Sequence, residues 1–91
     1  MERERILGVA IRCGEAVFKL QAPARHADLI LMLTIFFSEL GSYFPHDQSA
    51  LGFYTSRRPF ADRRLAAEIA KFSGQVIKPV AYNYLTSENV W

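Results

Sequence analysis

The chain has 91 residues, of which 51% are hydrophobic and 22% are charged, and its formal net charge is +2 at pH 7. This length and composition predict one globular domain over residues 1–91 and exclude a disordered chain. A dedicated DNA- or RNA-binding protein is also excluded, because its affinity would come from many phosphate contacts and needs a larger positive charge.

Signals for disulfides, zinc and membranes are weak. Cys13 is the only cysteine, so an internal disulfide is excluded, and one cysteine with two histidines gives no zinc-ligand spacing. The apolar run at 29–37 is nine residues long, whereas a membrane-spanning helix needs about twenty. The first residues lack the apolar region of a secretory peptide. We therefore expect a cytoplasmic protein without a metal or a cofactor.

The first half of the chain predicts a β-hairpin and a long helix. Residues 5–12 and 15–20 are rich in β-branched and aliphatic types on either side of a Cys-Gly turn. A helix is expected over 24–40, between a proline that suits its first turn and Gly41. This helix is apolar on nearly all sides, so we expect part of it to pack on a second copy of the chain, which would make the protein a homo-oligomer.

The second half predicts a short strand at 51–56, a second helix and an extended tail. The helix begins near Asp62, a good N-cap residue, and ends at Ser73-Gly74. Its buried stripe is expected to contain Leu65, Ala66, Ile69 and Phe72, and its other face has possible ion pairs among Arg64, Glu68 and Lys71. The resulting order, β-β-α-β-α with an extended tail, is an α+β fold with helices packed on a small antiparallel sheet.

A basic loop joins the short strand to the second helix. Its polar side chains, with those of the helix start, are Thr55, Ser56, Arg57, Arg58, Arg63 and Arg64. Cations at a helix N-terminus raise the electrostatic energy, and hydroxyls, backbone N–H groups and guanidinium forks together suit a phosphate or a carboxylate. The alternative is a set of solvated arginines, neutralised in part by Asp62 and Glu68.

A second basic pair, Arg25-His26, lies in the first turn of the other predicted helix. Positively charged residues at the starts of both helices favour an anion site that the two helices share. The alternative is that Arg25 pairs with Asp28 and that His26 is merely exposed. Most aromatic residues are expected in the core, but some can stack on a nucleobase, namely Tyr43, Tyr54, Tyr82 and Trp91. An aromatic ring beside a phosphate site would describe a nucleotide.

Catalysis has little support in the sequence. His46-Asp47 offers a base and a carboxylate, but adjacent residues seldom orient each other in that way. No serine elbow or second convincing acid accompanies this pair, and Cys13 has no neighbouring histidine. We therefore expect a binding protein with no catalytic residue, and a small hydrolase that uses His46 or His26 is the least supported alternative.

Several segments carry a family resemblance. They are PARH at 23–26, GFYTS at 52–56, FADRRLA at 60–66, IAKFSGQ at 69–75 and SENVW at 87–91. In order and spacing these resemble a family of small, mostly uncharacterised phage and prophage proteins with the pattern PARHH, GFxTSxGRFVxREEAxxIAxxxGQ and LYSEDLW. The chain departs from the pattern at Ala27, Arg58-Pro59 and Arg64-Leu65. The matching positions are Arg25, His26, Gly52, Thr55, Phe60, Arg63, Gly74, Gln75, Ser87, Glu88 and Trp91.

The resemblance implies a phage context, in which small proteins often inhibit host defence. We expect a binding protein of the host cytoplasm that sequesters a phosphate-bearing nucleotide, such as a cyclic nucleotide immune signal, without cleaving it. The residues expected to bind this ligand are Arg25, His26, Thr55, Ser56, Arg57, Arg63, Gln75 and Trp91. The main alternative is a protein that inhibits a host defence complex in the manner of anti-CRISPR proteins, with its arginines against an acidic partner.

Overall fold

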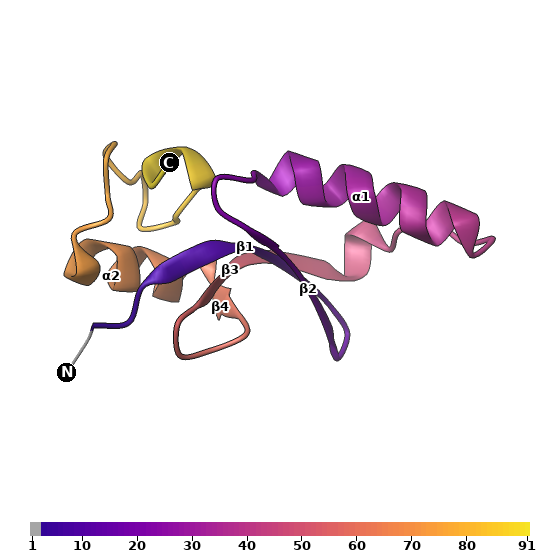
Figure 1. The fold of residues 1–91 in the computed structure, drawn as a ribbon, viewed down its shortest axis with the longest axis horizontal. Helices are drawn as coiled ribbons and strands as arrows, with labels where there is room; N and C mark the ends of the chain where they lie inside the picture. The colour runs from indigo at the N-terminus through magenta and orange to yellow at the C-terminus, as the bar shows by residue number, and fades with distance from the viewer. Residues whose placement is uncertain (1–2) are drawn as a thin grey trace.

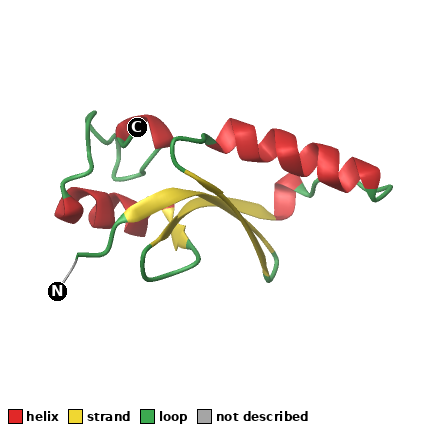
Figure 2. Cartoon of the chain, viewed as in Figure 1, coloured by secondary structure: helices red, strands yellow, loops and turns green. Residues whose placement is uncertain are grey.

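The computed structural model describes residues 3–91, which form a four-stranded antiparallel sheet with two α-helices (Figure 1, Figure 2). The strands are β1 (Ile6–Cys13), β2 (Ala16–Gln21), β3 (Ser49–Thr55) and β4 (Ala61–Asp62). The helices are α1 (His26–Glu39) and α2 (Arg63–Ser73), and two 3-10 turns are η1 (His46–Gln48) and η2 (Ser87–Asn89). The predicted α+β class, with helices on a small antiparallel sheet, is confirmed.

The sheet has the order β2-β1-β3-β4, with β1 and β3 as its two central strands. Val9 on β1 lies opposite Leu20 on β2 and Phe53 on β3, so these three side chains share one face of the sheet. Both helices contribute to the core on that face, in which Val9, Phe53 and Leu33 are buried. The two-residue strand β4 was not predicted, because two residues carry no visible alternation.

Gly52 on β3 allows the Phe60 ring to lie directly against the sheet. On the face of the sheet opposite Phe53, a Cβ at this position would lie 2.6 Å from the Phe60 ring. Arg12 covers that ring, with its guanidinium carbon 4.8 Å from the ring centroid. The glycine in the GFYTS segment is therefore explained by a close approach, not by a turn.

Helix α1 packs on β1 and β2 through a narrow stripe. Within His26–Glu39, the buried side chains are Leu29 and Leu33. Figure 1 shows that the C-terminal half of this helix extends along and past the end of the sheet. Most of its remaining apolar side chains are consequently exposed in a single copy of the chain.

Helix α2 begins and ends where the sequence predicted, but its buried stripe is different. Asp62 caps the helix by accepting a hydrogen bond from the Leu65 N–H at 2.8 Å, and Gly74 ends it with φ of 75°. The buried positions are Ala66, Ala67, Ile69 and Ala70. Leu65 and Phe72, predicted to be buried, are 37% and 71% exposed. The small alanine side chains face the sheet because they let the helix approach it closely.

The ion pairs predicted on α2 are wrong for residues 3–91. The guanidinium of Arg64 lies 5.7 Å from the Tyr84 ring centroid, and Lys71 donates a hydrogen bond to the Asn83 side chain at 3.0 Å. The cations of this helix therefore contact the C-terminal tail instead of Glu68.

The tail is not an extended segment, which corrects the prediction. Leu85 is fully buried, and residues after it form η2 before the chain ends. The Trp91 indole N–H donates to the Ala24 carbonyl at 2.9 Å, so the last residue holds the tail against the start of α1 (Figure 1). The sequence could not predict this arrangement, because the local spacing of residues does not show which distant segments Leu85 and Trp91 pack against.

No helix within residues 3–91 is long and apolar enough to cross a membrane.

Candidate functional site

The start of α1 places Arg25 and His26 beside the C-terminal tail. The Arg25 backbone N–H donates to the Asp28 carboxylate at 2.8 Å, and this acid at the third helical position fixes where α1 begins. The Arg25 guanidinium is thereby left free of Asp28, and its Nη1 donates to the Ser87 hydroxyl at 3.4 Å. The ion pair between Arg25 and Asp28, which the sequence left open as an alternative, is not formed.

His26 is half-buried and is oriented by two neighbours. Its ring lies edge-on to Phe53, with ring centroids 5.0 Å apart, and its Nε2 lies 2.6 Å from the Gly52 carbonyl oxygen. A carbonyl only accepts, so Nε2 carries the proton and Nδ1 is an acceptor. Burial lowers the pKa of His26; the bond to Gly52 opposes this effect, and the charge of Arg63 adds to it. The imidazole is therefore neutral at pH 7.

Arg63, the first residue of α2, is fixed by the tail. Its Nε donates to the Leu85 carbonyl at 3.0 Å, and the Leu85 N–H donates to the Arg63 carbonyl at 3.0 Å. Its guanidinium also lies 5.7 Å from the Tyr84 ring centroid. No hydrogen bond joins the two Nη atoms of Arg63 to any of residues 3–91. The fork is thus oriented through one edge, and its other donors remain available to an anion.

Two adjoining hollows share Arg63 and Thr86. One, of about 310 Å³, is lined by His26, Leu51, Arg63, Thr86, Ser87 and Glu88. The other, of about 360 Å³, is lined by Arg63, Pro79, Ala81, Tyr82, Tyr84, Thr86 and Asn89. We call these two hollows together the Arg63 groove. It places a guanidinium between a half-buried histidine on one side and two tyrosines on the other.

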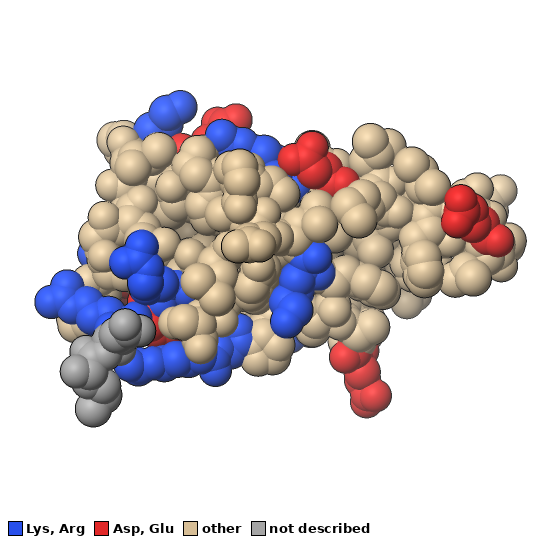
Figure 3. All heavy atoms as spheres, viewed as in Figure 1, with Lys and Arg blue, Asp and Glu red and all other residues tan. Residues whose placement is uncertain are grey.

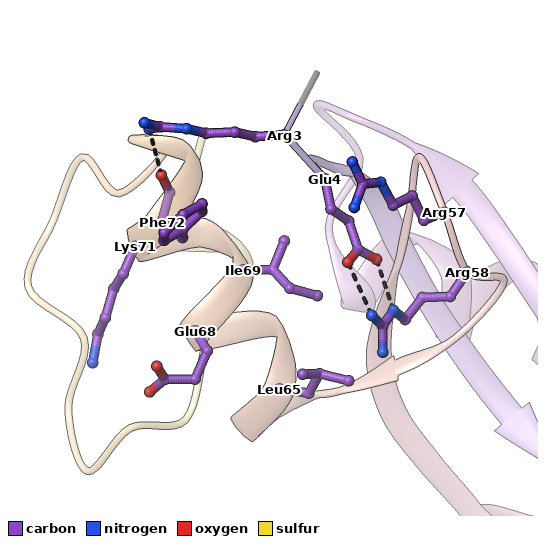
Figure 4. Close-up of a pocket in the computed structure, with 9 residues that line it drawn as sticks. All are labelled: Arg3, Glu4, Arg57, Arg58, Leu65, Glu68, Ile69, Lys71 and Phe72. Atoms are coloured by element: carbon purple, nitrogen blue, oxygen red, sulfur yellow. Dashed lines mark hydrogen bonds and ion pairs between the residues drawn. The ribbon is translucent and has the colours of Figure 1, made fainter. Parts of the chain in front are cut away.

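The basic loop lies at a different hollow, of about 770 Å³, between α2 and the β3–β4 loop (Figure 4). Its lining residues are Arg3, Glu4, Arg57, Arg58, Leu65, Glu68, Ile69, Lys71 and Phe72, and we call it the α2 hollow. Arg58 donates to both carboxylate oxygens of Glu4, at 2.7 and 3.0 Å (Figure 4). These bonds and one from Thr55 hold the pKa of Glu4 below its ordinary value.

Glu4 therefore supplies a negative charge that the basic loop was expected to obtain from a ligand. The Thr55 hydroxyl donates to Glu4 and accepts from the N–H groups of Arg57 and Arg58, at 3.1 and 3.0 Å. The Ser56 hydroxyl accepts from the Arg5 N–H at 3.0 Å. Thr55 and Ser56 thus order the loop and join it to the N-terminal segment, and neither lines the Arg63 groove.

Gln75 and Trp91 hold the fold around these hollows without lining any of them. The Gln75 side chain accepts from the Ile6 N–H at 2.7 Å and donates to the Ile6 carbonyl at 2.9 Å, so it joins the end of α2 to β1. Trp91 lies edge-on to Phe53, with ring centroids 6.1 Å apart. The predicted ligand residues are consequently divided: His26 and Arg63 line the same hollow and Arg25 bonds to Ser87 in its lining, whereas the others have separate positions.

Sequence reasoning did not single out Glu4, Tyr84 and Thr86 as site residues. Ser87 and Glu88 did have a signal, because both belong to the SENVW segment that carried the resemblance. Glu4 had none, since its partner Arg58 is 54 residues away along the chain.

The described residues form no metal-binding cluster, and His46 lies apart from the hollows. Within residues 3–91 no group of three or more His, Cys, Asp or Glu side chains is placed to hold a metal ion. His46 lies in η1, edge-on to Phe44 with ring centroids 4.5 Å apart, and lines none of the three hollows.

Comparison with known proteins gives one family. The profile of the family described as phage T4 y16D protein matches residues 5–91, which is nearly the whole chain. Neither the curated proteins nor the solved structures gave a match. The match supports the resemblance to small phage proteins, and it assigns no activity. The chain belongs to the phage T4 y16D protein family.

Proposed function

We propose that this phage protein binds a phosphate-bearing nucleotide in the Arg63 groove and sequesters it without cleaving it. In the host cytoplasm, this binding would withdraw a nucleotide signal, such as a cyclic nucleotide, from a host defence system. The observation that carries the proposal is the position of Arg63, whose uncommitted Nη donors lie between a hollow with a histidine and a hollow with tyrosines.

The phosphate would lie against the Nη atoms of Arg63. A guanidinium binds phosphate best when two N–H groups donate to the anion in parallel, which the two Nη atoms can do here. The bond from Nε to the Leu85 carbonyl orients the guanidinium in advance. Less side-chain entropy is then lost on binding, because the arginine is already held. Arg25 lies at the same end of the groove through its bond to Ser87 and adds a second positive charge.

The sugar and the base would lie on the two sides of this phosphate. Neutral His26 offers its Nδ1 lone pair to a ribose hydroxyl, since Nε2 already donates to Gly52. On the other side, Tyr82 is 90% exposed and Tyr84 is 46% exposed, so each has a ring face on which a base can stack. His26 has no proton to give to a leaving group in this arrangement, because Nε2 donates its one proton to the Gly52 carbonyl, and this suits binding without cleavage.

A matched pair of arginine variants tests this site. Arg63→Ala should weaken nucleotide binding about ten- to a hundredfold, since a hydrogen bond to a charged group contributes roughly 1.5–3 kcal/mol. Arg64→Ala is the control, because Arg64 lies at the same 5.7 Å from the Tyr84 ring but lines neither part of the groove. Calorimetric titration with a panel of cyclic nucleotides measures both affinities, and circular dichroism checks that each variant is folded.

Two results of this titration would contradict the proposal. One is an Arg63→Ala affinity within a factor of two of the unmodified chain. The other is equal weakening by Arg63→Ala and Arg64→Ala, which would indicate nonspecific attraction by positive charge.

One observation favours a second function, inhibition of a host defence complex by direct contact. In the α2 hollow, Leu65, Ile69 and Phe72 follow helical spacing i, i+4 and i+7 (Figure 4). Three further cations, Arg3, Arg57 and Lys71, line the hollow beside this stripe, together with Glu68 and the paired Glu4 and Arg58. An acidic amphipathic segment of a partner would match both features. A plaque assay on a host with an active defence system separates the two functions. Inhibition by direct contact requires that Phe72→Glu abolishes the protection of the phage and that Arg63→Ala preserves it. The reverse pattern favours nucleotide binding.

A further inference from the structure

Helix α1 exposes a continuous apolar surface. Leu31, Met32, Ile35 and Phe36 are 62%, 53%, 52% and 47% exposed, and Leu40 at the end of the helix is 65% exposed. We call these five residues the α1 surface. In a helix, positions three and four apart are neighbours, so the side chains at 31, 32, 35 and 36 form one patch. A patch of this kind on a small protein marks an interaction site.

We infer that the α1 surface is the interface between two copies of this chain, packed as antiparallel helices around a two-fold axis. The inference goes beyond the proposed function and does not depend on it, because no residue of the α1 surface lines the Arg63 groove.

The charge distribution favours a second copy as the occupant. Between Asp28 and Glu39, α1 has no charged residue. A two-fold interface brings each patch against itself, so a neutral apolar patch can pair without placing like charges together. Figure 3 shows the same segregation: Lys and Arg lie toward the end with α2 and the N-terminus, and the α1 end is largely uncharged with an acidic patch. A membrane surface is disfavoured, since helices that lie on membranes carry Lys or Arg beside their apolar face.

The helix ends favour the antiparallel orientation. Arg25 precedes the first turn of α1, where the helix dipole is positive, and Glu39 is its last residue. Antiparallel packing keeps the two Glu39 side chains apart and places the two helix dipoles in opposite directions. Parallel packing would instead place the two Glu39 side chains together and align the two dipoles.

The exposed area is large enough for a dimer. With Tyr43, which is 92% exposed beyond the end of α1, six large apolar side chains are available. At roughly 100 Å² each they give about 600 Å² per copy, near the ~800 Å² that each partner buries in a standard interface. We therefore expect a dimer that dissociates on dilution.

Sedimentation equilibrium of the full chain tests the interface with a matched pair of variants. The unmodified chain should have about twice the 10.4 kDa mass of one copy at high micromolar concentration. Ile35→Glu, near the two-fold axis, places two carboxylates together and should raise the dimer dissociation constant at least tenfold. Ile77→Glu makes the same change at a tail residue that is 65% exposed, and it should leave the constant within twofold. Circular dichroism verifies that both variants are folded.

The inference is overturned if the unmodified chain has the mass of one copy at about 100 µM, or if Ile35→Glu, folded, leaves the dimer unchanged. Spin labels test the orientation, on Leu40→Cys in a Cys13→Ser background. With a rise of 1.5 Å per residue, antiparallel helices centred near Ile35 should place the two labelled positions about 15–20 Å apart. A separation below about 10 Å would indicate parallel helices and would overturn the antiparallel arrangement.

Discussion

At the scale of single residues, a negative charge supplied from within the chain changes the interpretation of the basic loop. The sequence shows Arg57 and Arg58 beside a helix start and suggests a waiting anion. In the structure, Glu4 forms two hydrogen bonds with Arg58 and one with Thr55. Arg63 differs, because its own partner is a neutral carbonyl and its charge is not cancelled by a carboxylate within hydrogen-bonding distance. This contrast selects Arg63 as the residue on which the proposed site depends.

His26 predicts a pH dependence of folding stability. Burial lowers its pKa below the ordinary value of 6.5, so between the two pKa values the unfolded chain binds a proton that the folded chain does not. The free energy of unfolding should therefore fall as pH drops below about 6.5. Urea unfolding of the unmodified chain and of His26→Gln between pH 7.5 and 5 measures this effect. The variant should lose less stability over this range, and an equal loss in both proteins would show that another group is responsible.

Glu4 predicts a separate effect at lower pH. Its folded-state pKa is held below the ordinary value of 4.5, so its contribution to stability is present above that pH and is lost as pH falls through the folded pKa. Glu4→Gln should remove this loss below pH 4.5 while leaving the dependence near pH 6.5 intact. Unfolding curves of the variant that still decline below pH 4.5 as steeply as those of the unmodified chain would contradict the assignment.

At the scale of elements, the local signals were sufficient for α2 and the hairpin but not for the tail. Asp62 and Gly74 mark the ends of α2 through capping chemistry that depends only on neighbouring residues. Which face of α2 is buried depends instead on the sheet against which it packs. The alanine face lies against the sheet because its small side chains allow a close approach, and Leu65 and Phe72 are left exposed. The tail was misread because Leu85 is fixed by Arg63, which is 22 residues away along the chain.

In the C-terminal tail, the burial of Leu85 predicts a large loss of folding stability when its side chain is shortened. Leu85 is fully buried, so Leu85→Ala should destabilise the fold by about 2–5 kcal/mol through lost burial and the cavity left behind. Ile77→Ala, at an exposed position in the same tail, should cost less than about 0.5 kcal/mol. Chemical denaturation gives both values. Similar small losses in the two variants would indicate that the tail is not part of the cooperative core.

At the scale of the whole molecule, three surfaces have separate chemistry. The Arg63 groove has arginine, histidine and tyrosine side chains, the α2 hollow combines an apolar stripe with cations, and the α1 surface is neutral and apolar. The sequence predicted the pairing of Arg63 with Arg25 and His26 from their positions at two helix starts. It could not separate these residues from Thr55, Ser56 and Arg57, because the distinction is made by Glu4 and by the path of the tail.

Recovery of bound nucleotide tests the central proposal most directly. Cyclic nucleotides are mixed with an excess of the full chain, unbound ligand is removed by filtration, the protein is denatured, and released ligand is quantified by mass spectrometry. The account predicts that at least one nucleotide is retained by the unmodified chain and by Arg64→Ala, is lost with Arg63→Ala, and is recovered intact. Retention of no nucleotide, or recovery of a hydrolysed product, would contradict it.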